Sequence, residues 1–231
     1  MKKRPLILFG GGLDSCALVE QNRCLNPLLL YFDYGQKALA GEMAAMEFFA
    51  AKYRLDTEVI IIPASVIPRS PLTTEGVVKR MQDHASNYIP GRNLIFSTLA
   101  FSYAVRWGFG PILLGASPAP PESAFHDAKV SFAAAFNALT ALAYPMRDPG
   151  ATSLLLDTPL LLFPLVGEVR KEYLAAALKQ EPRLFEVAFT CYEGVGNYEC
   201  GECVHCQQKA ALAKELGASM RPTLLRLRGE K

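Results

Sequence analysis

Long hydrophobic runs are missing from this sequence of 231 residues. The longest apolar stretch, Leu154 to Val166, is interrupted by one aspartate and two prolines and falls short of the roughly 20 apolar residues that cross a membrane. Only Leu6 to Phe9 separate the basic N-terminus from three glycines, so we expect no signal peptide. We therefore expect a cytoplasmic protein without a membrane partner.

A strong net charge is missing as well. The formal charge of +2, from 24 Lys and Arg against 22 Asp and Glu residues, is too small to indicate nucleic-acid binding. With 51% hydrophobic and 20% charged residues, the chain has the composition of a folded protein rather than a disordered one. We expect one α/β body with an appendage, and no direct nucleic-acid partner.

Short apolar runs alternate with helical patterns along the chain. Strands are predicted at Leu6–Phe9, Leu28–Phe32, Glu58–Ile62 and Ile112–Leu114. Helices are predicted at Ser15–Cys24, Ala38–Tyr53, Leu94–Arg106, Ser131–Leu142 and Val169–Leu178. This alternation predicts a Rossmann-like parallel sheet with helices on both faces and ligands at the carboxyl ends of its strands. We assign residues 1–180 to this domain and residues 181–231 to a C-terminal metal-binding segment with a helix.

Three consecutive glycines follow the first predicted strand, in the stretch Phe9-Gly-Gly-Gly-Leu-Asp-Ser15. Glycines let backbone N–H groups approach a ligand, and a following helix N-terminus attracts anions, so the loop predicts a phosphate site. An ordinary strand-to-helix turn is the alternative. The stretch lacks the ending of a Walker loop and is too compressed for the dinucleotide fingerprint. Ser15 can donate to a phosphate oxygen, whereas Asp14 either orients magnesium or caps the helix.

Four of the six cysteines cluster near the C-terminus, as Cys191-x8-Cys200-x2-Cys203-x2-Cys206. This spacing predicts tetrahedral sulfur ligation of a structural zinc ion with no open position. Disulfides are not expected in a cytoplasmic protein. An iron–sulfur cluster would use the same ligands, but nothing else in the chain calls for electron transfer. His205 lies between two ligands, and we interpret it as a bystander.

The two remaining cysteines fall on the first predicted helix. Cys24 is interpreted as a small residue that fills the core. Cys16 lies close enough to the glycines to be a candidate reactive thiol.

Taken together, four motifs resemble the QueC family of 7-cyano-7-deazaguanine synthases in order and spacing. They are the glycine stretch with Asp14-Ser15, Phe32-Asp-Tyr-Gly-Gln36, Ile89-Pro-Gly-Arg-Asn-Leu-Ile-Phe96 and the cysteines from Cys191 to Cys206. The resemblance spans nearly the whole chain, and the family belongs to the ATP pyrophosphatases.

The resemblance implies a fold, an activity and a set of ligands. The fold would be adenine nucleotide alpha-hydrolase-like, in a homodimer that binds one structural zinc per chain and uses ATP with magnesium. The reaction would convert 7-carboxy-7-deazaguanine and ammonia to 7-cyano-7-deazaguanine through an adenylated carboxylate and an amide. The product would enter queuosine biosynthesis.

The resemblance also implies roles for particular residues. Catalytic roles fall on Asp14, Ser15, Arg92 and Asp127. ATP contacts fall on Phe9, Gly10, Gly11, Gly12, Leu13, Asp14, Ser15, Cys16, Ala17, Leu18, Val19, Arg92, Asn93 and Gly115. Substrate contacts fall on Tyr34, Gln36, Ser123, Phe125, Asp127 and Lys129. As alternatives, Arg92 is an exposed residue at a helix start, and Tyr34 and Gln36 are loop residues that pack against the body.

The chain departs from the family pattern in three places. Gly10 replaces the serine that usually opens the loop. The stretch from Ala116 to Lys129 keeps few of the family's residues, and its final cation is a lysine instead of an arginine. A Ser-Lys pair is replaced by Leu165-Val166, and Arg170 or Lys171 is the candidate to supply the missing charge.

These departures keep two other hypotheses open. The chain could be a divergent relative that adenylates a similar carboxylate and transfers it to another acceptor, such as a partner protein in antiviral defence. It could also be a nucleotide-binding module that has lost catalysis.

Overall fold

The computed structural model describes residues 3–67, 70, 72–73, 89–116, 126–144, 158–165 and 169–224. Within these residues, five parallel strands form one sheet in the order β3-β2-β1-β4-β5. The strands are β1 (Leu6–Leu8), β2 (Leu28–Asp33), β3 (Thr57–Ile61), β4 (Ile112–Leu114) and β5 (Leu161–Leu162). The predicted α/β class is confirmed.

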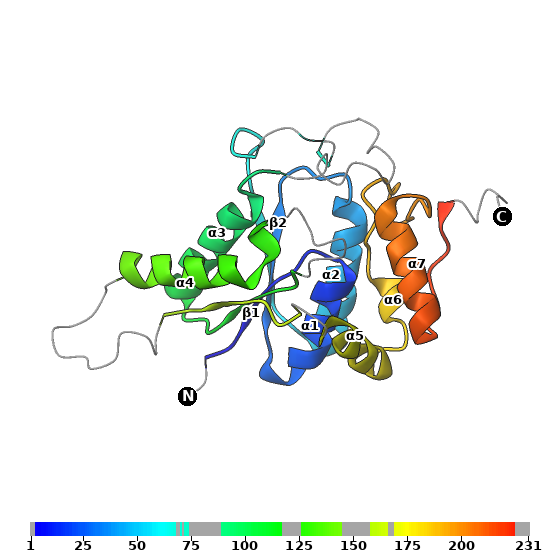
Figure 1. Ribbon diagram of the computed structural model, residues 1–231, viewed down its shortest axis with the longest axis horizontal. Helices are drawn as coiled ribbons and strands as arrows, with labels where there is room; N and C mark the ends of the chain where they lie inside the picture. Colours follow the sequence, from blue (N-terminus) through cyan, green and yellow to red (C-terminus); the bar gives the residue numbers. More distant parts are fainter. Residues whose placement is uncertain are drawn as a thin grey trace.

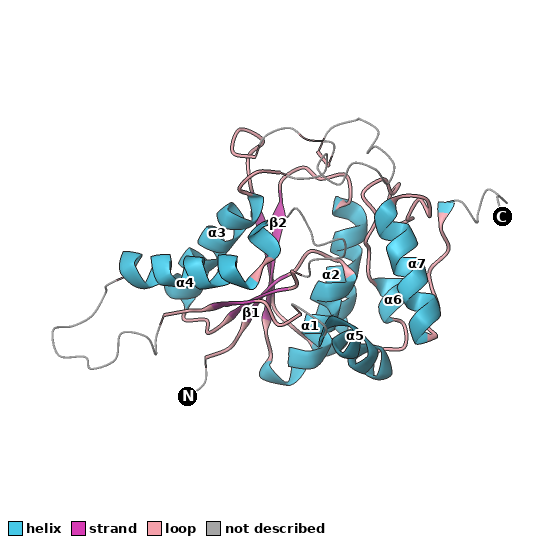
Figure 2. Cartoon of the chain, in the orientation of Figure 1, coloured by secondary structure: helices cyan, strands magenta, loops and turns pink. Residues whose placement is uncertain are grey.

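Helices cover both faces of this sheet (Figure 1). On one face lie α1 (Leu13–Asn22), α2 (Leu39–Tyr53), α5 (Val169–Gln180), α6 (Leu184–Val187) and α7 (Val204–Leu216); on the other lie α3 (Arg92–Trp107) and α4 (Val130–Ala143). Successive strand residues point to opposite faces, so Ile7 joins the first core, whereas Leu6 and Leu8 join the second. Figure 2 shows the strands between the two sets of helices.

The sequence patterns did not predict β5, which has two residues. Its Leu161 pairs with Ile112 of β4. Asn137 of α4 also clamps Leu161, because its Nδ2 donates to the Leu161 carbonyl at 2.9 Å and its Oδ1 accepts from the Leu161 amide at 2.8 Å. A strand this short has no periodicity of its own, so tertiary contacts define it.

The C-terminal segment packs against the α/β domain. Leu184 and Phe185 of α6 and Ala213 of α7 belong to the same buried cluster as residues of α1 and α2. The boundary between residues 1–180 and 181–231 stays a prediction. Across the residues that the structure describes, no helix is both long enough and apolar enough to cross a membrane.

The strand order reverses between β1 and β4. From β1 the sheet extends through β2 to β3 on one side and through β4 to β5 on the other. In such sheets, ligands bind outside the carboxyl ends of the strands at the point of reversal. Gly10 follows β1 and Gly115 follows β4, so two of the predicted ATP-contact segments meet at this point.

Candidate active site and metal centre

The glycine loop, residues 10–12, turns the chain from β1 into α1. Gly11 has a φ of +69°, and a Cβ at this position would lie 2.6 Å from the Cα of Glu42. Gly12 is extended, with φ −74° and ψ 168°, and it is the N-cap of α1 without a side-chain cap hydrogen bond. The alternative in which Asp14 caps the helix is therefore wrong. The first amides of α1 have no intrahelical partner, and such amides can bind an anion.

Asp14 instead forms an ion pair with Arg170 in the first turn of α5. The Nε of Arg170 lies 2.9 Å from Oδ1 of Asp14. Burial raises the pKa of Asp14, and the positive charge of Arg170 opposes that shift. Lys171 points elsewhere and pairs with Glu215 of α7. Of the two cations considered in the sequence, Arg170 is the one that the fold brings to the glycine loop.

Gly115, which follows β4, packs against the first turn of α1 at Asp14 and Ser15. A Cβ on Gly115 would lie 3.0 Å from both the Asp14 carbonyl carbon and the Ser15 nitrogen, so a larger residue would push the two segments apart. The Oγ of Ser15 donates to the Gly12 carbonyl at 3.0 Å. A Cβ on Gly10 would meet nothing within 4 Å, so this position has room for the hydroxyl that the family's serine would supply.

The other predicted ATP-contact residues around α1 are core residues. The side chains of Phe9, Leu13, Cys16, Ala17, Leu18 and Val19 are all buried on the α1 face of the sheet. They hold α1 in place, so a ligand at this helix start would meet the backbone of the first turn and not these side chains.

Both cysteines near α1 differ from expectation. Cys16 is fully buried, its Sγ donates to the Gly11 carbonyl at 3.4 Å, and burial raises its pKa, so it is not a reactive thiol. Cys24 lies in a 3-10 turn, Arg23–Leu25, and is exposed. Because α1 ends at Asn22, before Cys24, the interpretation of Cys24 as core filler is wrong.

A polar cluster that the sequence analysis missed lies beside the glycine loop. Tyr31 of β2 donates at 2.6 Å to Oε2 of Glu42 on α2, and Nε2 of Gln36 lies 3.1 Å from the same oxygen. Within the described residues, Oε1 of Glu42 has no hydrogen-bond partner. Burial raises the pKa of Glu42. A lone acidic residue in the first turn of the helix after β2 was the sequence signal for this site.

Gln36 is committed to this cluster. Its Nε2 also lies 2.6 Å from Oη of Tyr31 and 3.1 Å from the Phe32 carbonyl. Its Oε1 accepts from the Tyr34 amide at 3.0 Å. Both the amide nitrogen and the amide oxygen of Gln36 are therefore hydrogen-bonded within the protein. This favours the alternative in which Gln36 packs against the body, where it also holds Glu42 in place.

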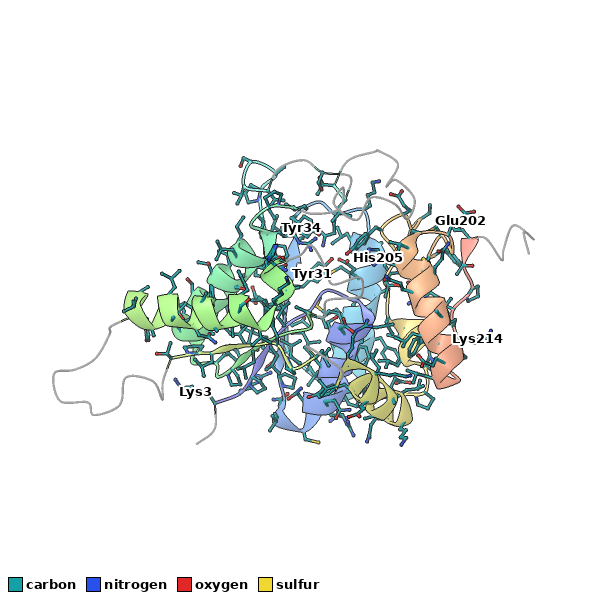
Figure 3. The ribbon with its side chains drawn as sticks, viewed as in Figure 1. Lys3, Tyr31, Tyr34, Glu202, His205 and Lys214 are labelled. Carbon is teal, nitrogen blue, oxygen red and sulfur yellow. The ribbon has the colours of Figure 1, made fainter. Side chains whose placement is uncertain are left out.

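Arg92 is the first residue of α3, and it faces the same cluster. Its Nη1 donates to Oη of Tyr34 at 3.3 Å, and its charge attracts the Glu42 carboxylate. Burial raises the pKa of Tyr34 to about 12, and the Tyr34 ring packs against Phe96 with centroids 5.5 Å apart. Arg92 is half-buried, so the alternative of an exposed arginine at a helix start is wrong. Figure 3 shows Tyr31 and Tyr34 at this end of β2.

A cavity of about 410 Å³ opens at the start of α3. It is lined by Gly91, Leu94, His126, Asp127, Ser131 and Phe132. Nδ2 of Asn93 donates to the Asp127 carbonyl at 3.4 Å, and burial raises the pKa of the Asp127 carboxyl group. Lys129 is the N-cap of α4. Ser123 and Phe125 lie outside the described residues.

The four C-terminal cysteines bring their sulfurs together at the start of α7. All four Sγ atoms, from Cys191, Cys200, Cys203 and Cys206, lie within 4.8 Å of one another. Sulfurs that bind a tetrahedral metal at about 2.3 Å lie roughly 3.8 Å apart, so this set fits a metal ion. The amide of Cys200 donates to the Cys191 sulfur at 3.2 Å, which favours the thiolate form. His205 packs its ring on Tyr192, with centroids 4.2 Å apart.

Comparisons with known proteins agree with this geometry. A family model described as queuosine biosynthesis protein QueC matches residues 4–217. A 7-cyano-7-deazaguanine synthase of Solidesulfovibrio magneticus is 29% identical over 94% of this chain and 94% of its own length. One from Coxiella burnetii is 30% identical over 92% of this chain and 94% of its own length. One from Thermoplasma volcanium is 27% identical over 94% of this chain and 89% of its own length.

A solved structure of a U34-tRNA thiolase, NcsA from Methanococcus maripaludis with its 4Fe-4S cluster, aligns at 12% identity with a TM-score of 0.44. That alignment covers 93% of this chain and 66% of the thiolase, and a likeness this weak does not extend to the metal. The family model, in contrast, matches the sequence itself across the glycine loop, Glu42, Arg92 and all four cysteines. The chain belongs to the QueC family of queuosine biosynthesis proteins.

Proposed function

We propose that this chain is an ATP-dependent carbon–nitrogen ligase that converts 7-carboxy-7-deazaguanine and ammonia to 7-cyano-7-deazaguanine. The observation that carries the proposal is the convergence, at the strand-order reversal, of the glycine loop, the start of α1 and Arg170. The proposal also draws on the relatives, which bear the name of this synthase.

The chemistry needs an activated acid, because a carboxylate is a poor electrophile. Transfer of AMP from ATP to the carboxylate releases pyrophosphate and gives ammonia an acyl-adenylate to attack, which yields an amide and AMP. A second ATP then activates the amide oxygen, whose departure with AMP leaves the nitrile.

In this proposal the glycine loop and the first amides of α1 hold the phosphates, where fixed donors stabilise developing charge with little reorganisation. Arg170 adds a positive charge, and Asp14 orients its guanidinium through the 2.9 Å contact. Asp14 is thereby engaged with Arg170, so we assign magnesium to the ATP phosphates. Ser15 and Arg92 are the other donors assigned to the reacting groups.

Recognition of the base falls in part to Glu42. A guanine-type base presents N–H donors along its pyrimidine edge, and a carboxylate is their natural acceptor. Tyr31 and Gln36 fix one oxygen of Glu42, which leaves Oε1 for the ligand. Tyr34, beside Arg92, offers a ring on which the base can stack.

For the four-cysteine site we propose zinc in a structural role. Four thiolates and no open position suit this ion, which would fix the turn that leads into α7. We also propose that the enzyme is a cytoplasmic homodimer, as the resemblance implies.

A reconstitution tests the proposed function. Purified protein incubated with ATP, magnesium, ammonia and 7-carboxy-7-deazaguanine should yield AMP, pyrophosphate and a product whose mass matches the nitrile. The control replaces the acid with 7-deazaguanine, which lacks the reacting carboxylate and should yield no AMP. Absence of AMP with the acid would overturn the proposal. AMP release with no nitrile would replace it with a ligase that serves another acceptor.

A further inference from the structure

Phe189 joins the metal centre to the glycine loop. It lies two residues before Cys191, and it is 2% exposed. Its amide donates to the Gly11 carbonyl at 2.8 Å. Gly11 holds a left-handed backbone conformation with a φ of +69°, so a bond to its carbonyl helps to fix the orientation of the loop.

The Phe189 ring fills a slot that glycines leave open on two sides. A Cβ on Gly41 of α2 would lie 2.2 Å from this ring, and a Cβ on Gly194 would lie 2.5 Å from it. The guanidinium carbon of Arg221 lies 5.5 Å from the ring centroid. The ring therefore contacts α2 and the loop between Cys191 and Cys200, so a shift of either one displaces it.

The backbone on both sides of Phe189 is also held by side chains. Lys209 of α7 donates to the Ala188 carbonyl at 2.7 Å. The Thr190 amide donates to Oε1 of Glu199 at 2.7 Å, and Lys209 donates to Oε2 of the same carboxylate at 2.8 Å. These contacts tie residues 188–190 to α7, which begins among the metal ligands at Val204.

A bound metal would fix both ends of this arrangement. Cys191 follows the segment directly, and Cys206 lies three residues, about one helical turn, before Lys209 on α7. Loss of the ion would release Cys191 and the start of α7 together. The Phe189 segment would then lose the supports that hold its amide against Gly11.

We infer that Phe189 is a positioning residue through which the metal centre sets the geometry of the glycine loop, so that metal occupancy and ATP affinity are coupled. This inference rests on the proposed function for its ATP readout. The coupling is reciprocal, and typical values lie at about 5- to 150-fold in affinity.

Calorimetry with ATP and magnesium provides the main test, on zinc-loaded protein and on protein stripped by a chelator. We expect stripping to weaken ATP binding about 10-fold in the wild-type chain. In Phe189→Leu, which keeps its backbone amide and loses the ring, the ratio between the two affinities should fall toward one. The matched control is Phe185→Leu, since Phe185 is equally buried in α6, and its ratio should equal the wild-type ratio. An unchanged ratio in Phe189→Leu would overturn the inference.

Two further measurements cover the case in which the stripped protein unfolds. Zinc affinity, measured by competition with a chromogenic chelator, should rise with ATP by the same factor in wild type and not in Phe189→Leu. Hydrogen exchange over residues 9–18 needs no nucleotide, and on the zinc-loaded proteins it should be faster in Phe189→Leu than in Phe185→Leu. Equal exchange would count against Phe189, whereas faster exchange without any ATP binding would support the link and overturn only the proposed function.

Discussion

Two carboxylates near the glycine loop are held in opposite ways. Glu199 is fully buried, and both of its oxygens are occupied: Oε1 by the amide and hydroxyl of Thr190, and Oε2 by Lys209. Glu42 has Oε2 occupied by Tyr31 and Gln36, and its Oε1 has no partner among the described residues. Both carboxylates are linked to Phe189. Glu199 accepts from Thr190, the residue after Phe189, and Glu42 follows Gly41, which lies against the Phe189 ring.

This difference in hydrogen bonding indicates a structural role for Glu199 and a binding role for Glu42. An acceptor that is fully buried without a partner costs stability, which is why both oxygens of Glu199 need their donors, whereas Glu42 is half-buried and its Oε1 is not cut off from water. The saturated Glu199 cluster is complete without a ligand, and we assign it to holding the metal segment. Glu42 keeps one oxygen available to a donor from water or from a ligand, which is the expected property of a binding residue.

The largest effect is expected from removing Lys209 from the Glu199 cluster. Lys209→Met removes the cation that is hydrogen-bonded to the buried Glu199 carboxylate, which should lower the free energy of unfolding by about 3 to 5 kcal/mol. Denaturant titrations measure the loss. Lys214→Met, at an exposed position of the same helix, is the control and should change little. A small effect of Lys209→Met would mean that the cluster does not hold the segment.

The next largest effect is expected from a substitution of Glu42. Glu42→Gln should lower kcat/KM for the 7-deazaguanine acid about 10- to 100-fold, the range of a hydrogen bond to a charged group, while KM for ATP stays unchanged. Steady-state kinetics with each substrate in turn measure both values. Glu47→Gln, at an exposed site of α2, is the control. A loss confined to ATP would assign Glu42 to the nucleotide instead.

The sequence predicted the parts of this site that depend on local rules. The glycine loop, the four cysteines and Arg92 at the start of α3 are each visible in a short stretch of residues. The sheet followed from strands that alternate with helices, and four of the five strands lie within about one residue of their expected bounds.

Most features that the sequence did not predict depend on contacts between residues far apart in the chain. The pairing of Asp14 with Arg170 joins residues 156 positions apart, and the bond from Phe189 to Gly11 is longer still in sequence. The polar role of Glu42 depends on Tyr31 and Gln36 meeting it across β2 and α2. β5 is defined by β4 and Asn137 and not by its own residues.

Asp14 and Arg170 represent an intermediate case, in which one carboxylate oxygen is occupied by a cation that also faces the glycine loop. Arg170→Met should raise KM for ATP about 10-fold, because it removes one charged donor from the phosphates. The neighbouring Lys171→Met is a close control, since Lys171 pairs with Glu215 away from the loop. Equal KM values for the two variants would exclude Arg170 from nucleotide binding.

The smallest effect is a pH dependence at Glu42. Burial raises the pKa of this carboxyl group in the folded state, so the folded protein binds the proton more tightly than the unfolded chain does. Wild-type stability should therefore fall as pH rises from the unfolded value, near 4.3, through the raised one. The side chain introduced by Glu42→Gln does not titrate. The free energy of unfolding of the variant minus that of wild type should therefore be smaller at pH 5 than at pH 8. The change in this difference should stay below about 1 kcal/mol, because water partly screens a half-buried group. Urea titrations across this range measure it, and a wild-type advantage that grows with pH would show that the charged form is the one that the folded cluster stabilises.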